Sequence, residues 1–297
     1  RDFLFYLSVD PILRKNYHDQ LTLSTLYAYS EHYILTLGSR DVGSLEEFMA
    51  KLPGDEKQKL AQVREAYSYM MVHPGCKMMA PGTDMPEGLA KCIQALNTLY
   101  KSLPALYQMD DEYDGFEWVQ LMKYEENVIT FLRKTEKPEE TLLVICNFAA
   151  IPYENYQVGV PFAGKEIFNS DAVEFGGEGV VNSRVKTAKA EECDEREYSI
   201  KVKLPALGVS IYSCTPGKAP ARKKVTAAKT AKDKTAKDKT AGKLVRTVKA
   251  KTPAKKSVKE EKATKVEEAV KAEKKAETVK KRATVKNDNN KADRNSK

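Results

Sequence analysis

The sequence predicts an α/β segment, then an all-β domain, then a disordered lysine-rich tail. Apolar residues recur with helical spacing up to about residue 105, and from about residue 117 to 215 they occur in short strand-like runs. The last segment contains no Phe, Tyr, Trp, His or Cys. We therefore expect three parts, which are residues 1–105, 106–216 and 217–297.

The first part opens with one or two helices within residues 1–30, because Pro11 favours the start of a helix over its interior. The run 33–37 is short, apolar and rich in β-forming residues, and it ends at Gly38. This pattern predicts a buried strand that opens into a loop. Ser44 followed by Glu47 is a capping box, so a short helix is expected over residues 44–51.

A longer helix is expected next, capped by Asp55 and ended by Pro74 and Gly75. Its apolar side chains fall on one face: Leu60, Val63, Tyr67 and Met70. Residues 78–80 predict a second strand, and a closing helix follows from Glu87. That helix also has one apolar face: Leu89, Ile93, Leu96 and Tyr100. The order helix, strand, helix, strand, helix fits the last quarter of a (β/α)8 barrel.

The second part is expected to be an antiparallel β-sandwich of about 100 residues. Its predicted strands are separated by Gly, Pro, Asn and Asp turns: 116–121, 128–133, 141–148, 156–160, 166–168, 198–204 and 209–212. Gly176 to Gly179 lies between such runs and lacks the Lys-Ser/Thr of a phosphate loop, so we expect a tight turn rather than a nucleotide site.

The net charge of +8 combines two opposite parts. Residues 217–297 carry 28 Lys and Arg against 10 Asp and Glu, whereas residues 1–216 have a net charge of −10. The tail has too few apolar residues to offset chain entropy, so it should be disordered in isolation. A solvated tail, nonspecific binding of nucleic acid by counterion release, and contact with acidic protein surfaces all remain open.

The cysteines and histidines show no spacing typical of a metal site. The five cysteines are odd in number, which favours a reducing compartment and a cytoplasmic location. His18, His32 and His73 are unpaired in sequence, so packed or capping roles are expected. No apolar run approaches the roughly 20 residues of a membrane span. We expect no metal, no cofactor and no membrane contact.

An ordered series of motifs is similar to a known family. The series comprises Asp10–Pro11, Arg14–His18, Tyr27–Glu31, Leu52–Asp55, His73–Gly75, Phe116–Trp118, Cys146–Phe148 and Phe168–Gly177. It resembles the bacterial 1,4-alpha-glucan (glycogen) branching enzymes of the alpha-amylase superfamily over roughly residues 1–215. The resemblance starts within the family's catalytic barrel and the first residue is Arg, so we expect a C-terminal portion of a longer polypeptide. It implies α-glucan as substrate, with cleavage of α-1,4 links and formation of α-1,6 branches.

The resemblance also implies that this chain is inactive alone. The family's loop after the first predicted strand reads Ser-His-Asp-Glu, and Arg40 occupies the position of its transition-state-stabilising Asp. A carboxylate about 4 Å from the developing positive charge contributes roughly 4 kcal/mol at an effective dielectric near 20, or about three orders of magnitude in rate. A one-residue slip onto Asp41 is disfavoured by the flanking apolar residues. The family's nucleophile and acid/base lie upstream of Arg1.

Two further residues are candidates for contact with a glucan. Asp84 follows the second predicted strand, where the family has Gly-Gln-Glu and a long acceptor-side loop that is mostly missing here. We expect Asp84 either to line a substrate site or to be a solvated loop residue. Trp118 is expected in the core of the sandwich, with stacking on a sugar ring as the alternative. Two other function classes remain: a non-catalytic glucan-associated module, and a polyanion-binding protein that acts through its tail.

Overall fold

The computed structural model describes residues 2–23, 25, 34–38, 42–80 and 85–215. The chain divides into two units, residues 1–227 and 228–297, and the second lies wholly outside the described residues. The expected disorder of residues 217–297 therefore stays a prediction.

The first part of the chain has the predicted alternation of helices and strands. Its elements are α1 (Asp2–Ser8), η1 (Arg14–Tyr17), α2 (Asp19–Thr22), β1 (Ile34–Gly38), α5 (Leu45–Ala50), α6 (Glu56–Val72), β2 (Cys76–Ala80) and α7 (Glu87–Ser102). β1 and β2 are parallel, with Ile34 opposite Cys76 and Gly38 opposite Ala80. β1 also contacts α6.

Both predicted helix starts are confirmed, the one at Ser44 as the predicted capping box and the one at Asp55 as a cap that also forms such a box. The Ser44 hydroxyl accepts a hydrogen bond from the Glu47 amide at 3.2 Å, and the Asp55 carboxylate accepts one from the Gln58 amide at 2.9 Å. In each case the backbone amide of the capping residue donates a hydrogen bond to the side chain three residues later. These reciprocal bonds satisfy amides that a helix N-terminus otherwise leaves unpaired. α6 ends at Val72, immediately before His73 and Pro74.

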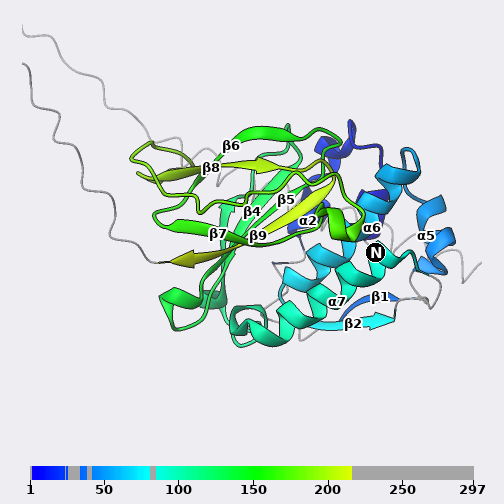
Figure 1. The fold of residues 1–297 in the computed structure, drawn as a ribbon, viewed down its shortest axis with the longest axis horizontal. Helices are drawn as coiled ribbons and strands as arrows, with labels where there is room; N and C mark the ends of the chain where they lie inside the picture. The colour runs from blue at the N-terminus through cyan, green and yellow to red at the C-terminus, as the bar shows by residue number, and fades with distance from the viewer. Residues whose placement is uncertain (1, 24, 26–33, 39–41, 81–84, 216–297) are drawn as a thin grey trace, which may run out of the picture. The chain divides into compact units, whose positions relative to one another are not determined.

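The second part is all antiparallel β-structure, as predicted. Its elements are η2 (Pro104–Leu106), η3 (Tyr113–Gly115), β3 (Phe116–Gln120), β4 (Val128–Arg133), η4 (Pro138–Glu140), β5 (Leu142–Asn147), β6 (Tyr153–Gly159), β7 (Ala163–Asn169), η5 (Val173–Phe175), β8 (Ser199–Leu204) and β9 (Gly208–Thr215). One sheet has the order β3-β4-β5-β9-β7, and β6 pairs with β8 in a second sheet (Figure 1). Each of the seven predicted strand runs overlaps one of these strands.

The five-stranded sheet is buried on both of its faces. One face shares a core with the helices, to which Phe131, Val144 and Ile211 contribute. The other face packs on the β6–β8 sheet through a second core that includes Leu143 and Tyr212. All residues of β4 and β5 are consequently buried. A sheet covered on both faces explains why these strands are almost continuously apolar instead of alternating.

The prediction that Trp118 lies in the core of the sandwich was wrong. It is half-buried and lies on the helix-facing side of β3, where it meets Phe116 and Phe131 edge to face at 4.9 and 5.7 Å between ring centroids. It pairs in register with Phe131, whose side chain also faces the helices. The pleat of the edge strand therefore directs Trp118 away from the core between the two sheets.

The predicted single apolar face of α6 was also too narrow. Every residue from Gln62 to Val72 is buried, including Arg64, Glu65 and Ser68. α6 contacts β1 on one side and β5 and β9 on the other, so little of its C-terminal half reaches solvent. The cost of burying Arg64 is partly offset by a hydrogen bond of 2.9 Å from its Nε to the Ser170 carbonyl.

A buried ionic cluster around Asp110 joins the two parts of the chain. The Asp110 carboxylate accepts hydrogen bonds from Lys77 Nζ, at 3.1 Å, and from Arg133 Nη2. Arg133 also donates to the Val72 carbonyl at the end of α6, at 2.7 Å. Lys77 comes from β2 and Arg133 from β4, and their side chains are 5% and 0% exposed. Asp110 thus compensates two buried cations from different sheets.

We expect Asp110→Ala to lower the free energy of unfolding by about 3 kcal/mol or more, because it leaves Lys77 and Arg133 buried without their anion. Urea unfolding followed by circular dichroism measures this change. Glu125→Ala is the matched control: it removes the carboxylate of a solvent-exposed pair with Lys15 and should cost less than about 1 kcal/mol. Equal effects of the two substitutions would contradict the assigned role of Asp110.

Glu65 is a buried carboxyl group without a hydrogen-bond partner. Its side chain is fully buried on α6, and neither carboxylate oxygen has a partner. Burial raises the pKa of Glu65 well above its ordinary value, although the charge of Arg14 acts in the opposite direction. Arg14 bonds instead to the carbonyls of Leu7 and Phe148, at 2.8 and 2.9 Å, and to Gln62. Burial therefore favours the protonated form of Glu65.

A raised pKa in the folded state makes stability fall as pH increases. The folded protein keeps the Glu65 proton above the pH at which the unfolded chain loses it, so the free energy of unfolding should drop by up to about 1.4 kcal/mol per pH unit in that window. Glu65→Gln removes the titration, so this variant should be more stable than the parent at pH 8 and similar to it at pH 4. Denaturation series from pH 4 to 8 measure the difference, and parallel pH profiles would count against a raised pKa.

Candidate functional site

The two site residues predicted from sequence, Arg40 and Asp84, lie outside the described residues. The strands that precede them end side by side, because Gly38 of β1 is paired with Ala80 of β2. The two segments thus leave from neighbouring strand C-termini. In α/β folds this edge carries the chemistry, so the expected location of the site is consistent with the topology.

One face of the β1–β2 pair is open to solvent. Ile34 and Met78 are 60% and 50% exposed, and Thr36 and Cys76 on the same face are also exposed. We call these four residues the open face. On the opposite face, Leu37 is buried in the core that the helices share with the five-stranded sheet. The described residues therefore cover the pair on one side only.

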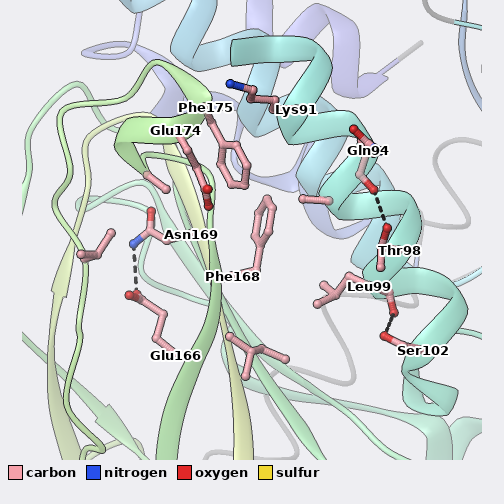
Figure 2. Close-up of a pocket in the computed structure, with 14 residues that line it drawn as sticks. Lys91, Gln94, Thr98, Leu99, Ser102, Glu166, Phe168, Asn169, Glu174 and Phe175 are labelled. Atoms are coloured by element: carbon pink, nitrogen blue, oxygen red, sulfur yellow. Dashed lines mark hydrogen bonds between the residues drawn. The ribbon is translucent and has the colours of Figure 1, made fainter. Parts of the chain in front are cut away.

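A groove of about 610 Å3 lies between α7 and the strand β7 with its following turn η5 (Figure 2). We call it the α7 groove. α7 lines it with polar side chains spaced three or four residues apart: Lys91, Gln94, Thr98 and Ser102. Phe168 and Phe175 lie beneath it with ring centroids 5.6 Å apart, and each is only 6% exposed. The groove therefore offers a polar rim over buried aromatic rings.

The carboxylate of Glu166 in this groove is fully engaged. It accepts hydrogen bonds from the side chains of Asn169, Asn182 and Tyr212 at 3.0 to 3.2 Å, and from the Asn182 amide at 2.5 Å. Figure 2 shows the bond to Asn169. Four hydrogen bonds hold this carboxylate in place and tie β7 to Asn182 and Tyr212. Glu166 therefore has a structural role at the α7 groove.

The glycine-rich segment Gly176 to Gly179 forms the predicted tight turn. The Asp171 carboxylate accepts hydrogen bonds from the Glu178 amide at 2.9 Å and the Val180 amide at 3.0 Å. Gly176 has a φ of 80°, in the left-handed region that glycine adopts readily. Because these two amides point at Asp171, the turn does not present them to a phosphate.

The described histidines and the cysteines have structural positions. His18 Nε2 lies 2.7 Å from the Leu121 carbonyl, and buried His73 places Nδ1 2.8 Å from the Pro74 carbonyl. His32 lies outside the described residues. All five cysteines are free, as predicted, and Cys76 is exposed. Among the described residues, no group of three or more His, Cys, Asp or Glu side chains is arranged to hold a metal ion.

Comparison with known proteins identifies the class of domain first. Residues 118–215 match the family described as the alpha amylase C-terminal all-beta domain, in agreement with the antiparallel sheets found there. This part of the chain is similar to that family.

The wider chain is similar in sequence to 1,4-alpha-glucan branching enzymes. It is 35% identical to the branching enzyme GlgB of Oceanobacillus iheyensis over 71% of this chain and 37% of that protein. It is 37% identical to GlgB of Aquifex aeolicus over 70% of this chain and 37% of that protein. The resemblance read from the motif series is confirmed. The chain spans little more than a third of the length of these relatives.

Among solved structures, a debranching enzyme from Nostoc punctiforme has a TM-score of 0.33 and 16% identity, covering 52% of this chain and 31% of that one. That likeness is too low to carry an argument. Within the described residues, the structure contains no helix with the length and apolarity needed to cross a membrane.

Proposed function

We propose that this chain is the C-terminal part of a 1,4-alpha-glucan branching enzyme, which cleaves α-1,4 links and forms α-1,6 branches on an α-glucan. Residues 1–105 would supply the last quarter of a (β/α)8 barrel and residues 106–216 its all-β domain, followed by the basic tail 217–297. The free thiols support a reducing, cytoplasmic location.

The open face is the observation that carries this proposal. Parallel sheets are almost always covered on both faces, yet β1 and β2 are covered on one, and Ile34 and Met78 are left in solvent. Two strands cannot close a barrel. α6 already contacts β1 on the other face, so further parallel strands are the cover that fits. The relatives are almost three times the length of the matched segment and have room for them.

The chemistry supports an inactive chain. Retaining glycoside chemistry needs two carboxylates that flank the scissile bond. Among the described residues, Glu65 is sealed in the core and Glu166 is saturated with donors. Arg40 would place a positive charge where the family has its stabilising carboxylate. Asp84 would remain as a substrate-lining residue at the neighbouring strand end.

A branching assay on amylose tests the proposal, with the fall in iodine-complex absorbance as the readout. We expect no activity from the chain alone or from its Arg40→Asp variant. Mixing with the remaining, separately produced part of the Aquifex aeolicus enzyme should restore activity in the Arg40→Asp variant far more than in the parent, by about three orders of magnitude. Activity in the unmixed chain would contradict the proposal.

Labelling of Cys76 gives a readout that does not depend on activity. Cys76 is on the open face, whereas Cys92, Cys146 and Cys214 are buried, so a thiol reagent should modify Cys76 much faster than those three. Mixing with the remaining part of the Aquifex aeolicus enzyme should slow the labelling of Cys76. A Cys76→Ser chain should show no such change in labelling. Protection without restored branching would favour a non-catalytic glucan-associated module.

The tail favours a second candidate function. Residues 217–297 carry a net charge of +18 without any aromatic residue, which suits nonspecific contact with a polyanion through counterion release. This candidate does not exclude the first, because the two functions use different segments.

We expect the full chain to be retained on immobilised duplex DNA at about 50 mM salt and released well before 500 mM. A chain ending at residue 216 keeps all described residues and should flow through, since its net charge is −10. Scrambling residues 217–297 preserves charge and should preserve retention. Retention of the shortened chain would show that the tail is not the contact.

A further inference from the structure

We infer that Thr187 is the phosphate acceptor of a protein kinase that recognises basic residues on the N-terminal side of its target. This inference goes beyond the proposed function and does not depend on it. Thr187 lies in residues 183–189, which read Ser-Arg-Val-Lys-Thr-Ala-Lys. We call this stretch the side segment, because it runs past the edges of β7 and β8 at one side of the all-β domain.

A repeated sequence pattern points to Thr187. Arg184 precedes it by three positions and Lys186 by one, and no other Thr in residues 1–216 has basic residues at both positions. The same pattern recurs at three threonines of the basic tail: Thr235, Thr240 and Thr252. Kinases select their substrates through charge patterns of this kind, so the four threonines suit the same enzyme.

The backbone of the side segment is extended and fixed at two points. Lys186 exchanges two backbone hydrogen bonds of 2.8 Å with β7, and Lys189 exchanges two with β8, at 2.9 and 3.0 Å. Between these points Ala188 is buried in the second core, whereas Thr187 is exposed. Successive side chains of extended backbone point to opposite sides, so the burial of Ala188 directs Thr187 to solvent.

The Thr187 hydroxyl is free to react. Within the part of the chain that the structure describes, it has no hydrogen-bond partner. Thr135, which also follows a lysine, differs because its hydroxyl donates to the Glu140 carboxylate at 2.8 Å and accepts from the Lys137 amide at 3.1 Å. A kinase must place the acceptor hydroxyl against its catalytic Asp, which takes the hydroxyl proton. Thr187 meets this requirement without losing an existing bond.

The cations of the side segment are available for recognition. Among the described residues, Arg184, Lys186 and Lys189 form no ion pair. The neighbouring Lys201 and Lys203 of β8 are instead paired with glutamates, at 2.7 and 2.9 Å. Arg184 is also exposed, so an acidic group of the kinase can bind it without displacing a partner.

The reaction uses ATP as its second substrate. Oγ1 of Thr187 attacks the γ-phosphorus while the bond from that phosphorus to the β–γ bridging oxygen breaks, so ADP leaves and the hydroxyl proton passes to the kinase's Asp. The product is a phosphate monoester with a charge of about −2 at pH 7. The side segment has three cations and no acidic residue, so its charge falls from +3 to about +1. The modification thus removes most of the positive charge of this segment.

Incubation of the full chain with ATP and a calcium/calmodulin-dependent protein kinase, which selects Arg three positions before its target, tests the site. A protease that cleaves after Glu releases residues 179–191, and fragmentation in a mass spectrometer separates Thr187 from Ser183. We expect phosphate on Thr187. Ser183 is the internal control, because it is exposed in the same segment but lacks basic residues at the two corresponding positions, and it should stay unmodified.

Two variants of Arg184 test the recognition. Arg184→Ala should lower the rate of Thr187 phosphorylation about tenfold, and Arg184→Lys should keep most of the rate because the charge is retained. Lys165→Ala is the matched control: it removes an exposed cation of β7 that does not precede Thr187, and it should leave the rate unchanged. Thermal unfolding confirms that each variant folds.

A free peptide of residues 179–191 decides the other outcomes. Phosphorylation of the peptide but not of the full chain would overturn the site, because the folded side segment would then be closed to the kinase. No phosphorylation of either, or an unchanged rate in Arg184→Ala, would overturn the assigned recognition. Phosphate on Ser183 in place of Thr187 would overturn the assigned acceptor.

Discussion

The five-stranded sheet is buried on both faces, and the rest of the described structure depends on this. Residues at alternate positions of β4 and β5 contribute to two different cores, one with the helices and one with the β6–β8 sheet. The helical part therefore shares its core with the all-β domain, and residues 1–227 form one compact unit. Burial of apolar surface contributes about 25 cal/mol per Å2 to folding. Loss of the helices or of the β6–β8 sheet would therefore remove stabilisation that no local interaction replaces.

Double-sided burial also explains the polar interior. Elements that lie between two layers must bury any polar side chain they carry, and each such group needs a partner. Arg14 meets this requirement with carbonyls from Leu7 and Phe148, and Arg64 with the carbonyl of Ser170. Asp110 compensates Lys77 and Arg133 together. Glu65 lacks a hydrogen-bonding partner and is accommodated by keeping its proton.

Features that depend on nearby residues were predictable from sequence, and features that depend on distant contacts were not. The capping box at Ser44, the N-cap at Asp55 and the strand runs follow from short-range patterns, and all were found. The complete burial of α6 and the orientation of Trp118 depend on layers that come from elsewhere in the chain. The donors to Glu166 were missed for the same reason, since Asn182 and Tyr212 are 16 and 46 residues away from it. The predicted site residues Arg40 and Asp84 fall outside the described residues, and only the adjacent strand ends bear on them.

The motifs that carry the family resemblance mostly hold the fold together. Arg14 and Phe148 belong to different motifs and are joined by a buried hydrogen bond of 2.9 Å. Within the Phe168–Gly177 motif, a Cβ on Gly177 would lie 2.2 Å from the Asp171 carbonyl oxygen, so packing alone requires glycine there. The departures from the family pattern, at Arg40 and Asp84, follow β1 and β2 in sequence and lie outside the described residues. Packing errors in either core cost free energy of folding, so residues such as Arg14, Phe148 and Gly177 retain the family pattern for a structural reason. The branching activity that we propose depends instead on loop positions and on further strands that we propose to cover the open face.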